Sequence, residues 1–389
     1  MIRIPSAPPD IDTVRTEFSH VGDVAYFNTG TFGTMADSVL QRVLDRIAYF
    51  EQKSYSVYHE ILADVETVRQ RLAARIGAEP TELTLTRNAT DGVNLVAAGI
   101  RWQPGDEVII SDQEHPAMNY PWLWASQTQG VVVRRFRVSH DPAETLANAI
   151  ALFSPKTRLI GASWITSPFG VRLPAQAICT AASERGILSL IDGAQAFAVI
   201  PVNVAELGCD FFTSNGHKWL GGPKGTGFFW ARSDRLRELT PAHVGAGCAE
   251  RFDVETGLQL WPDSRRFEFG TTAHTLWAGL GPALDWFDQL GWDWVESRTA
   301  SLAEYLKRAL TEIPGVHIKT PLAWERSSGL TTFALEKADA KDLEHYLAER
   351  WSVAPRSLGL PGHIRVSTAY FNTHAEIDRL IAGVRAYPR

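Results

Sequence analysis

Short apolar segments alternate with helix-forming stretches between residues 83 and 231 of this chain. The segments at 107–111, 158–165 and 187–191 are rich in Val, Ile and Leu, with little of the polar alternation of a one-sided sheet. Near-continuous apolar strands that alternate with helices are typical of a parallel sheet covered by helices on both faces. The sequence therefore predicts an α/β fold, in which functional groups gather at the carboxyl ends of the strands.

Polar residues follow several of these predicted strands, so we expect them to meet at one rim of the sheet. The residues in these positions are Thr90, His115, Ser167 and Asp192. The loop at 87–92 lies between a strand and a helix, where free N–H groups and the helix dipole favour an anion. Helix capping by Asn88, Thr90 or Asp91 explains the same polar residues equally well.

The stretch at 211–230 places Lys218 in a polar, glycine-rich turn between two apolar strands. A lysine held there can be stripped of water and lose part of its proton affinity, as a Schiff-base or general-base lysine requires. The alternative is a surface turn with a solvated lysine. Asp192 ends an apolar strand, so its carboxylate is partly desolvated and needs a cationic or N–H partner.

The composition excludes several classes of protein. The chain has 389 residues, 45% of them apolar, and a formal charge of −6, so it offers no basic field for nucleic acid or an anionic membrane. No stretch approaches the roughly 20 apolar residues of a membrane span, and residues 1–10 lack the apolar region of a signal peptide. The three cysteines are widely spaced, which predicts reduced thiols in a cytoplasmic protein, without disulfide or metal site.

The pattern changes on either side of this central region. The segment at 241–265 looks irregular, and the residues after it predict a smaller α/β lobe with helices at 275–290, 292–313, 340–350 and 374–387 and strands at 316–320, 329–335 and 363–367. Apolar periodicity predicts two helices between 36 and 76. The loop at 26–33 carries Gly30 and Gly33 beside aromatic residues, which indicates a close approach of its backbone to another part of the chain.

Three motifs occur in order along the chain: Asp192-Gly193-Ala194-Gln195, then His217-Lys218, then Arg365-Val366-Ser367 followed by Tyr370-Phe371-Asn372-Thr373. Together they resemble the class V aminotransferase family of enzymes that depend on pyridoxal 5'-phosphate (PLP) and have fold type I. The resemblance extends from Tyr26 to the last helix. It implies a large domain with a mainly parallel sheet and a smaller C-terminal α/β domain. We expect an N-terminal arm with an active-site loop at 1–35, a PLP-binding domain at 36–260 and a small domain at 261–389.

The resemblance also implies roles for individual residues at the cofactor. Lys218 is similar to the lysine that forms the Schiff base with PLP, and Asp192 to the residue that keeps the pyridine nitrogen protonated. His115 is similar to the residue that stacks on the ring; the alternative is a histidine that only begins a helix beside Pro116. The remaining cofactor contacts implied are Gln195 at the phenolic oxygen, Ser167 at the rim, and Ala89, Thr90, Asn215 and His217 around the phosphate.

Other implied roles concern the substrate and a second subunit. Arg365 is similar to the arginine that binds the carboxylate of an amino-acid substrate, although a surface arginine on a strand is the alternative. Asn28 and Thr29 are expected beside the substrate. Thr271 is similar to a phosphate contact from a second subunit, which implies a homodimer with a shared active site.

The chain departs from the cysteine desulfurases of this family. They carry a nucleophilic cysteine just before the strand of the carboxylate-binding arginine, and residues 354–361 contain none. The chain is more similar to the isopenicillin N epimerase-like branch, which includes enzymes of natural-product pathways. We expect β-elimination from an S-substituted cysteine, catalysed by a C–S lyase. The alternatives are an aminotransferase, an amino-acid epimerase and a PLP-fold protein that binds without catalysis. Tyr26, His243, Arg356 or a loop at 245–247 are candidates to select among these reactions.

Overall fold

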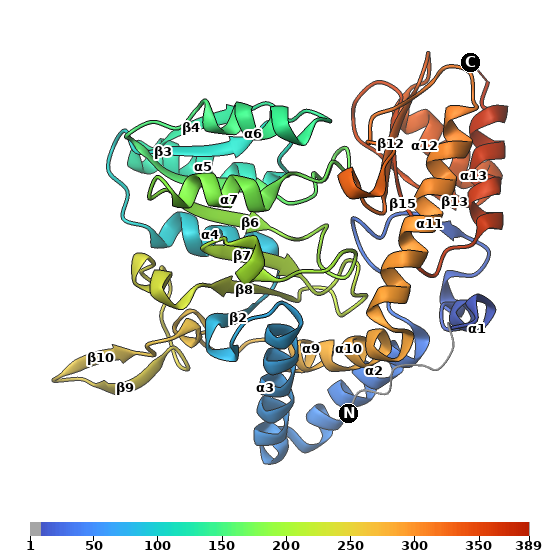
Figure 1. Cartoon of the computed structure of the whole chain (residues 1–389). Helices are drawn as coiled ribbons and strands as arrows, with labels where there is room; N and C mark the ends of the chain where they lie inside the picture. The colour runs from blue at the N-terminus through green and yellow to red at the C-terminus, as the bar shows by residue number, and fades with distance from the viewer. Residues whose placement is uncertain (1–8, 389) are drawn as a thin grey trace.

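The computed structural model describes residues 9–388 and contains a large mixed sheet that confirms the predicted α/β class (Figure 1). Its seven strands run in the order β2-β8-β7-β6-β5-β3-β4. β8 is antiparallel to β7 and β2, whereas β3 to β7 are parallel to one another. The strands are β2 (Leu83–Thr86), β3 (Glu107–Ser111), β4 (Val132–Phe136), β5 (Thr157–Ser163), β6 (Leu188–Asp192), β7 (Phe211–Asn215) and β8 (Gly227–Ala231).

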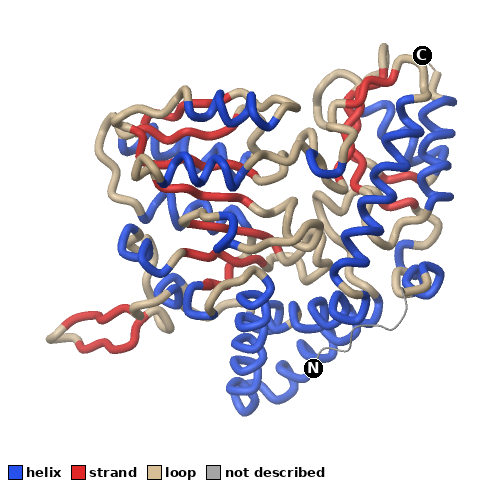
Figure 2. The backbone as a smooth tube through the Cα atoms, viewed as in Figure 1, coloured by secondary structure: helices blue, strands red, loops and turns tan. Residues whose placement is uncertain are grey.

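Helices cover both faces of this sheet because its central strands are apolar on both sides (Figure 2). The consecutive residues Phe211 and Phe212 of β7 belong to different core clusters, as the two-residue period of a strand requires. One cluster includes residues of α4 (Ala89–Gly99) and α5 (Pro116–Gln129). The other includes residues of α6 (Pro142–Ile150) and α7 (Ala175–Ser183).

A second, antiparallel sheet of four strands forms the smaller lobe, with the order β11-β12-β15-β14. Its strands are β11 (Val316–Ile318), β12 (Leu330–Leu335), β14 (Arg356–Ser357) and β15 (His363–Ser367), and its helices are α11 (Trp292–Thr311), α12 (Ala340–Trp351) and α13 (His374–Ala386). The N-terminal arm joins this lobe, because β1 (Ala25–Tyr26) pairs in parallel with β13 (Val353–Ala354). Phe27 is fully buried in the core cluster of this lobe, which also contains residues of α11, α12 and α13.

The remaining helices pack together below the large sheet in the view of Figure 1. They are α2 (Asp37–Lys53), α3 (Tyr58–Arg75), α9 (His274–Ala278) and α10 (Leu280–Leu290), with α1 (Ile11–Thr16) and the one-turn α8 (Val204–Leu207) elsewhere. Short 3-10 helices lie at Ser19–Val21, Ser54–Val57, Pro80–Glu82, Ser233–Glu238, Ser264–Phe267 and Trp324–Arg326. The predicted helical pair between 36 and 76 is confirmed.

The sequence prediction was wrong for part of the segment at 241–265. It contains a hairpin of β9 (Ala249–Asp253) and β10 (Gly257–Leu260), which projects from the lower left of Figure 1. Nearly all of its residues are exposed, so no alternation of buried and exposed positions marks it in the sequence. Among the described residues, no helix has both the length and the apolar character of a membrane span.

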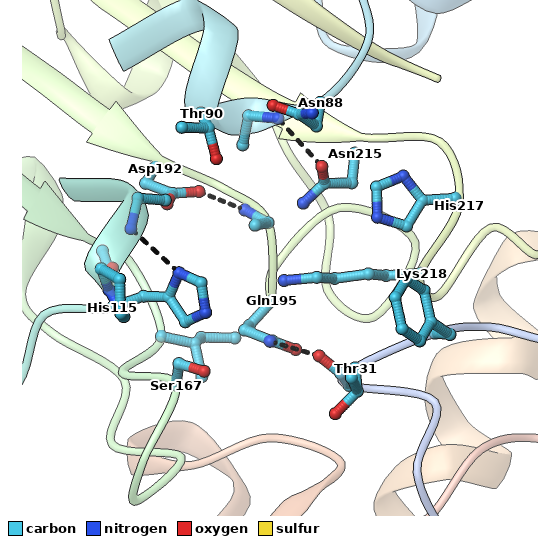
Figure 3. Close-up of a pocket in the computed structure, with 18 of the residues that line it drawn as sticks. Thr31, Asn88, Thr90, His115, Ser167, Asp192, Gln195, Asn215, His217 and Lys218 are labelled. Atoms are coloured by element: carbon cyan, nitrogen blue, oxygen red, sulfur yellow. Dashed lines mark hydrogen bonds between the residues drawn. The ribbon is translucent and has the colours of Figure 1, made fainter. Parts of the chain in front are cut away.

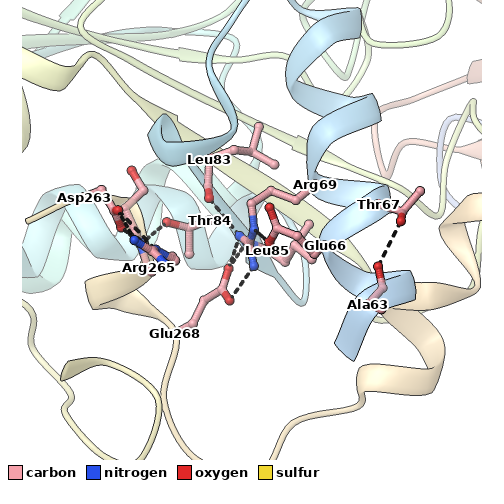
Figure 4. A network of polar contacts seen from close by, with 11 residues as sticks. Ala63, Glu66, Thr67, Arg69, Leu83, Thr84, Leu85, Asp263, Arg265 and Glu268 are labelled. Carbon is pink, nitrogen blue, oxygen red and sulfur yellow. Dashed lines mark hydrogen bonds and ion pairs between the residues drawn. The ribbon is translucent and has the colours of Figure 1, made fainter. Parts of the chain in front are cut away.

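A polar network ties α3 and β2 to the segment that follows the hairpin (Figure 4). Arg69 of α3 donates two hydrogen bonds to the carboxylate of Glu268, at 2.6 and 2.9 Å, and a third to the carbonyl of Leu83. Glu268 also accepts a hydrogen bond from the backbone N–H of Leu85 at 2.7 Å. Arg69 Nε also donates a hydrogen bond to the carboxylate of Glu66 at 2.9 Å. The Glu268 contacts therefore fix the start of the segment that contains Thr271.

The two carboxylates around Arg69 provide a matched pair of substitutions. The side chain of Glu268 is 18% exposed and that of Glu66 is 48% exposed, while Arg69 itself is 6% exposed. Glu268→Gln should lower the free energy of unfolding by about 3–5 kcal/mol, because the buried guanidinium loses its compensating charge. Glu66→Gln should cost less than about 1 kcal/mol. Urea denaturation measures both, and equal losses would contradict this account of the network.

Candidate active site

A cavity of about 480 Å³ lies where five strands of the large sheet end, between that sheet and the smaller lobe. The predicted residues that line it are Ala89, Thr90, His115, Ser167, Asp192, Gln195, Asn215, His217, Lys218 and Arg365. They lie at or just after the ends of β2, β3, β5, β6 and β7, apart from Arg365, which comes from β15. The structure thus brings these residues to one rim, and Figure 3 shows how most of them face the pocket.

Lys218 extends into the middle of the cavity, with its amine directed toward the side where His115 and Asp192 lie (Figure 3). Burial lowers the pKa of Lys218 to about 8; the charge of Asp192 opposes this shift, and those of Arg365 and Arg356 add to it. Burial raises the pKa of the Asp192 carboxyl, and Lys218 counteracts that shift. About a tenth of the amine is therefore neutral at pH 7, compared with less than about a thousandth for a lysine of ordinary pKa, and a nucleophilic or general-base lysine needs this neutral form.

Asp192 ends β6 and is 4% exposed. Its Oδ1 accepts a hydrogen bond from the N–H of Ala194 at 2.8 Å, which fixes the carboxylate at the strand end. A buried carboxylate needs further compensation from a positive or N–H donor group. The site therefore suits a ligand that presents a protonated ring nitrogen to Asp192.

His115 caps the start of α5, where its Nδ1 accepts a hydrogen bond from the N–H of Ala117 at 3.1 Å. Desolvation, together with the nearby charges of Lys218, Arg365 and Arg356, lowers the pKa of His115 to about 4. The ring is therefore neutral at neutral pH and carries its proton on Nε2, since Nδ1 is the acceptor. It serves as a helix cap and also offers an uncharged aromatic face to the cavity.

The loop at 30–33 and the lysine turn are joined by a backbone hydrogen bond and through the side chain of Gln195. Gln195 donates from Nε2 to the carbonyl of Gly30 and accepts from Trp219 Nε1, both at 2.8 Å. The N–H of Gly33 donates to the carbonyl of His217 at 2.8 Å. A Cβ on Gly33 would lie 1.7 Å from the carbonyl oxygen of Lys218, so only glycine fits there. The close approach predicted for this loop is confirmed.

The N-terminus of α4 lines one end of the cavity. Its first residue, Ala89, donates its N–H to Asn215 Oδ1 at 2.9 Å, which leaves the amide NH₂ group of Asn215 available to a ligand. His217 donates from Nδ1 to the carbonyl of Thr226 at 3.1 Å. We expected residues 87–92 to form a loop, but the helix begins at Ala89 because Asn88 caps it. This places the helix dipole at the cavity, where it favours an anion.

Arg365 is 3% exposed and is held by the loops on both sides of the cavity. Its Nη1 donates to the carbonyl and hydroxyl oxygens of Ser167 at 3.0 and 3.1 Å, and its Nη2 donates to Thr31 Oγ1 at 2.7 Å. Its Nε is buried and has no hydrogen-bond partner within the described residues. A carboxylate is the acceptor that best fits this guanidinium edge.

Two of the predicted substrate residues do not line the cavity. Gly30, Thr31 and Phe32 line it instead of Asn28 and Thr29. Asn28 Oδ1 accepts a hydrogen bond from Thr31 Oγ1 at 2.6 Å, so Asn28 orients Thr31 rather than facing a ligand. The signal for Thr31 was present in the motif between the two glycines, but the sequence does not show which of its side chains points inward.

Further residues of the site were missed or placed differently. Glu114 lines the cavity and accepts hydrogen bonds from Ser111 Oγ and Ser163 N, and burial raises the pKa of its carboxyl to about 7. The position of Glu114 directly before the predicted His115 is the sequence feature that could have identified it. Thr271 is exposed and does not line the cavity of its own chain, so its contact with a second subunit stays a prediction.

The donor set of the cavity fits PLP. The start of α4 and the free amide of Asn215 suit a phosphate group, and Asp192 suits a protonated pyridine nitrogen. Lys218 supplies an amine for the aldehyde, and the unpartnered Nε of Arg365 suits the carboxylate of an amino acid. No group of three or more His, Cys, Asp or Glu side chains within residues 9–388 is arranged to bind a metal ion.

The pH dependence of Lys218 tests this description of the site. In the cofactor-free protein, acetylation of Lys218 by acetic anhydride should rise with pH with a midpoint near pH 8, because only the neutral amine reacts. Asp192→Asn should move the midpoint to lower pH, since it removes the charge that raises the pKa of Lys218. Peptide mass spectrometry measures the modified fraction. A midpoint near the ordinary lysine value, or an upward shift in the variant, would contradict the account.

Comparisons with known proteins identify the family of this chain. Residues 34–380 match the family described as Aminotransferase class-V. The chain is 33% identical to isopenicillin N epimerase of Streptomyces clavuligerus, over 92% of this chain and 93% of that protein. It is 32% identical to a cysteine desulfurase of Pectobacterium atrosepticum, over 89% and 90% of the two chains.

Solved structures show the same relationship. The cystine C–S lyase C-DES, in complex with its reaction product cysteine persulfide, superposes with a TM-score of 0.89 at 26% identity, over 96% of this chain and 100% of that one. A point variant of C-DES, with glycine covalently linked to the PLP cofactor, also has a TM-score of 0.89. The chain therefore belongs to the class V aminotransferase family and is a PLP-dependent enzyme of fold type I.

Proposed function

We propose that this enzyme is a C–S lyase that releases a thiol from an S-substituted cysteine by β-elimination. The reaction converts the amino acid and water into pyruvate, ammonia and the free thiol. The supporting observation is a cavity with the amine of Lys218 and the carboxylate-binding edge of Arg365 but no thiol. The likeness to a cystine C–S lyase is in keeping with this choice.

The absence of a thiol distinguishes this reaction from desulfuration through an enzyme-bound persulfide. All three cysteines, Cys179, Cys209 and Cys248, lie in the described part of the chain, are buried, and do not line the cavity. Burial raises the pKa of Cys179 to about 12 and that of Cys209 as well, so these thiols are poor nucleophiles. Because no enzyme thiol lines the cavity to accept the sulfur atom, the thiolate released from the substrate would keep its substituent.

Each residue has a proposed part in the reaction. Arg365 binds the α-carboxylate and thereby orients the Cα–H bond, while Lys218 removes the proton from Cα as the general base. Asp192 would hold the protonated pyridine nitrogen of PLP, and the neutral His115 would offer its ring to the cofactor without adding charge. PLP, when bound, supplies the electron sink that makes Cα acidic. Gln195, Ser167, Ala89, Thr90, Asn215 and His217 complete the cofactor contacts.

Two properties of the whole protein belong to the same proposal. The enzyme acts as a homodimer in which Thr271 reaches the phosphate of the second subunit, in keeping with the exposure of this residue on its own chain. It acts in the cytoplasm, as its three unpaired cysteines favour a reducing compartment. The 33% identity to isopenicillin N epimerase supports a place in a natural-product pathway.

The reaction type is tested by mixing the holoenzyme with S-substituted L-cysteines and measuring pyruvate, thiol and the cofactor spectrum together. Equal amounts of pyruvate and thiol, with the starting spectrum restored after turnover, are expected. Accumulation of pyridoxamine phosphate and a requirement for a ketoacid would instead identify an aminotransferase. Exchange of the Cα hydrogen with deuterium from solvent, without release of pyruvate or thiol, would identify an epimerase. This second candidate function is favoured by the relative from Streptomyces.

Lys218→Ala should lower kcat for this elimination by about 10²–10⁴-fold, because proton transfer at Cα loses its base. Lys224→Ala is the matched control, since Lys224 donates to the carbonyl of Gly33 and does not line the cavity. Steady-state kinetics on both variants measures the difference. A similar kcat in the two variants would contradict the assignment of Lys218.

A further inference from the structure

Two arginines lie directly opposite each other at the substrate side of the cavity. Arg356 of β14 and Arg365 of β15 are partners in the antiparallel ladder. Both donate a hydrogen bond to the same hydroxyl, Thr31 Oγ1, each at 2.7 Å. Like charges in directly opposite positions of a sheet are destabilising. The arrangement therefore calls for negative charge from outside the chain.

The hydrogen bonds of Arg365 leave room for one carboxylate. Its Nη1 is used by Ser167, and one hydrogen of Nη2 is used by Thr31. The buried Nε and the second hydrogen of Nη2 form the remaining edge, which matches the two oxygens of a carboxylate. The α-carboxylate of the substrate, as proposed above, fills this edge.

Arg356 has more unused capacity. Its Nη1 hydrogen bond to Thr31 is the only hydrogen bond of its side chain within residues 9–388, and the guanidinium forms no ion pair there. The two carboxylates that line the cavity are engaged elsewhere: Asp192 with Ala194, and Glu114 with Ser111 and Ser163. Arg356 lines the same cavity, so its guanidinium lies beside the ligand space without an ion-pair partner in the described part of the chain.

We propose that the substrate carries a second anionic group, a carboxylate on its sulfur substituent, and that Arg356 binds it. This inference rests on the proposed function for the α-carboxylate at Arg365. The substrate class is then an S-(carboxyalkyl)cysteine or a related amino acid with a distal acid. The competing arrangement is that both arginines bind the same α-carboxylate, and it predicts no preference for a second acid.

Binding of two inert ligands tests the proposal without turnover. Glutarate and pentanoate have the same chain length and differ only in the second carboxylate. Calorimetry on the holoenzyme should show that glutarate binds about 10- to 100-fold more tightly, the effect of one charged hydrogen-bonded contact. Arg356→Gln should reduce this ratio to less than about threefold, and Arg356→Lys should restore part of it because the charge is kept.

Arg87→Gln is the matched control. Arg87 also lines the cavity, but it pairs with Asp91 at 2.7 Å, so its loss should preserve the ratio. Equal affinity of the wild type for both ligands would overturn the proposal, and so would an equal loss of both in Arg356→Gln, which would show a single shared carboxylate. The ratio of the two affinities in the wild-type protein tests the proposal even if the Arg356→Gln variant does not fold.

The outcome is separable from the elimination test. A preference for glutarate without any pyruvate from S-substituted cysteines would support the second anion site and reject the C–S lyase. The reverse result is pyruvate release at the same kcat/KM from S-(2-carboxyethyl)-L-cysteine and S-propyl-L-cysteine, with no preference between the inert ligands. It would support the C–S lyase and reject the second anion site.

Discussion

The site depends on a cation and an anion held with little water at the ends of two adjacent strands. Asp192 ends β6 and Lys218 follows β7, and the two strands are paired. Desolvation penalises both charged forms, so it raises the pKa of the carboxyl and lowers that of the amine to about 8. The apolar anchoring of β6 and β7 on both faces of the sheet offsets this penalty. The strand interiors thus supply the stability, and the strand ends supply the chemistry.

Three parts of the chain that are distant in sequence must come together before the cavity exists. The N-terminal arm contributes the loop with Thr31, the large sheet contributes Ser167, and the smaller lobe contributes Arg365. Hydrogen bonds among these three residues join the parts at the site itself. A substrate carboxylate at Arg365 would therefore touch the junction of the two lobes, which links ligand binding to their relative position.

The sequence predicted most of the sheet and the residues at its rim because apolar strands with polar ends give a local signal. Asp192 and Lys218 are examples, since Asp192 ends an apolar strand and Lys218 follows one. What it left open depends on contacts between distant segments. Arg356 was only one of several candidates to select the reaction, because β14 has two residues and no periodicity, and its position is set by pairing with β15. Likewise, the sequence does not show which of Asn28, Thr29 and Thr31 faces the cavity, and only the folded loop shows that it is Thr31.

Lys218 is the residue that we expect to link PLP to this chain. Reduction of the yellow holoenzyme with borohydride, followed by digestion and peptide mass spectrometry, measures the attachment point directly. We expect a pyridoxyl phosphate adduct on the peptide that contains Lys218. An adduct on Lys224, the other lysine of the same glycine-rich turn, or an unmodified Lys218 in fully reduced protein would contradict it.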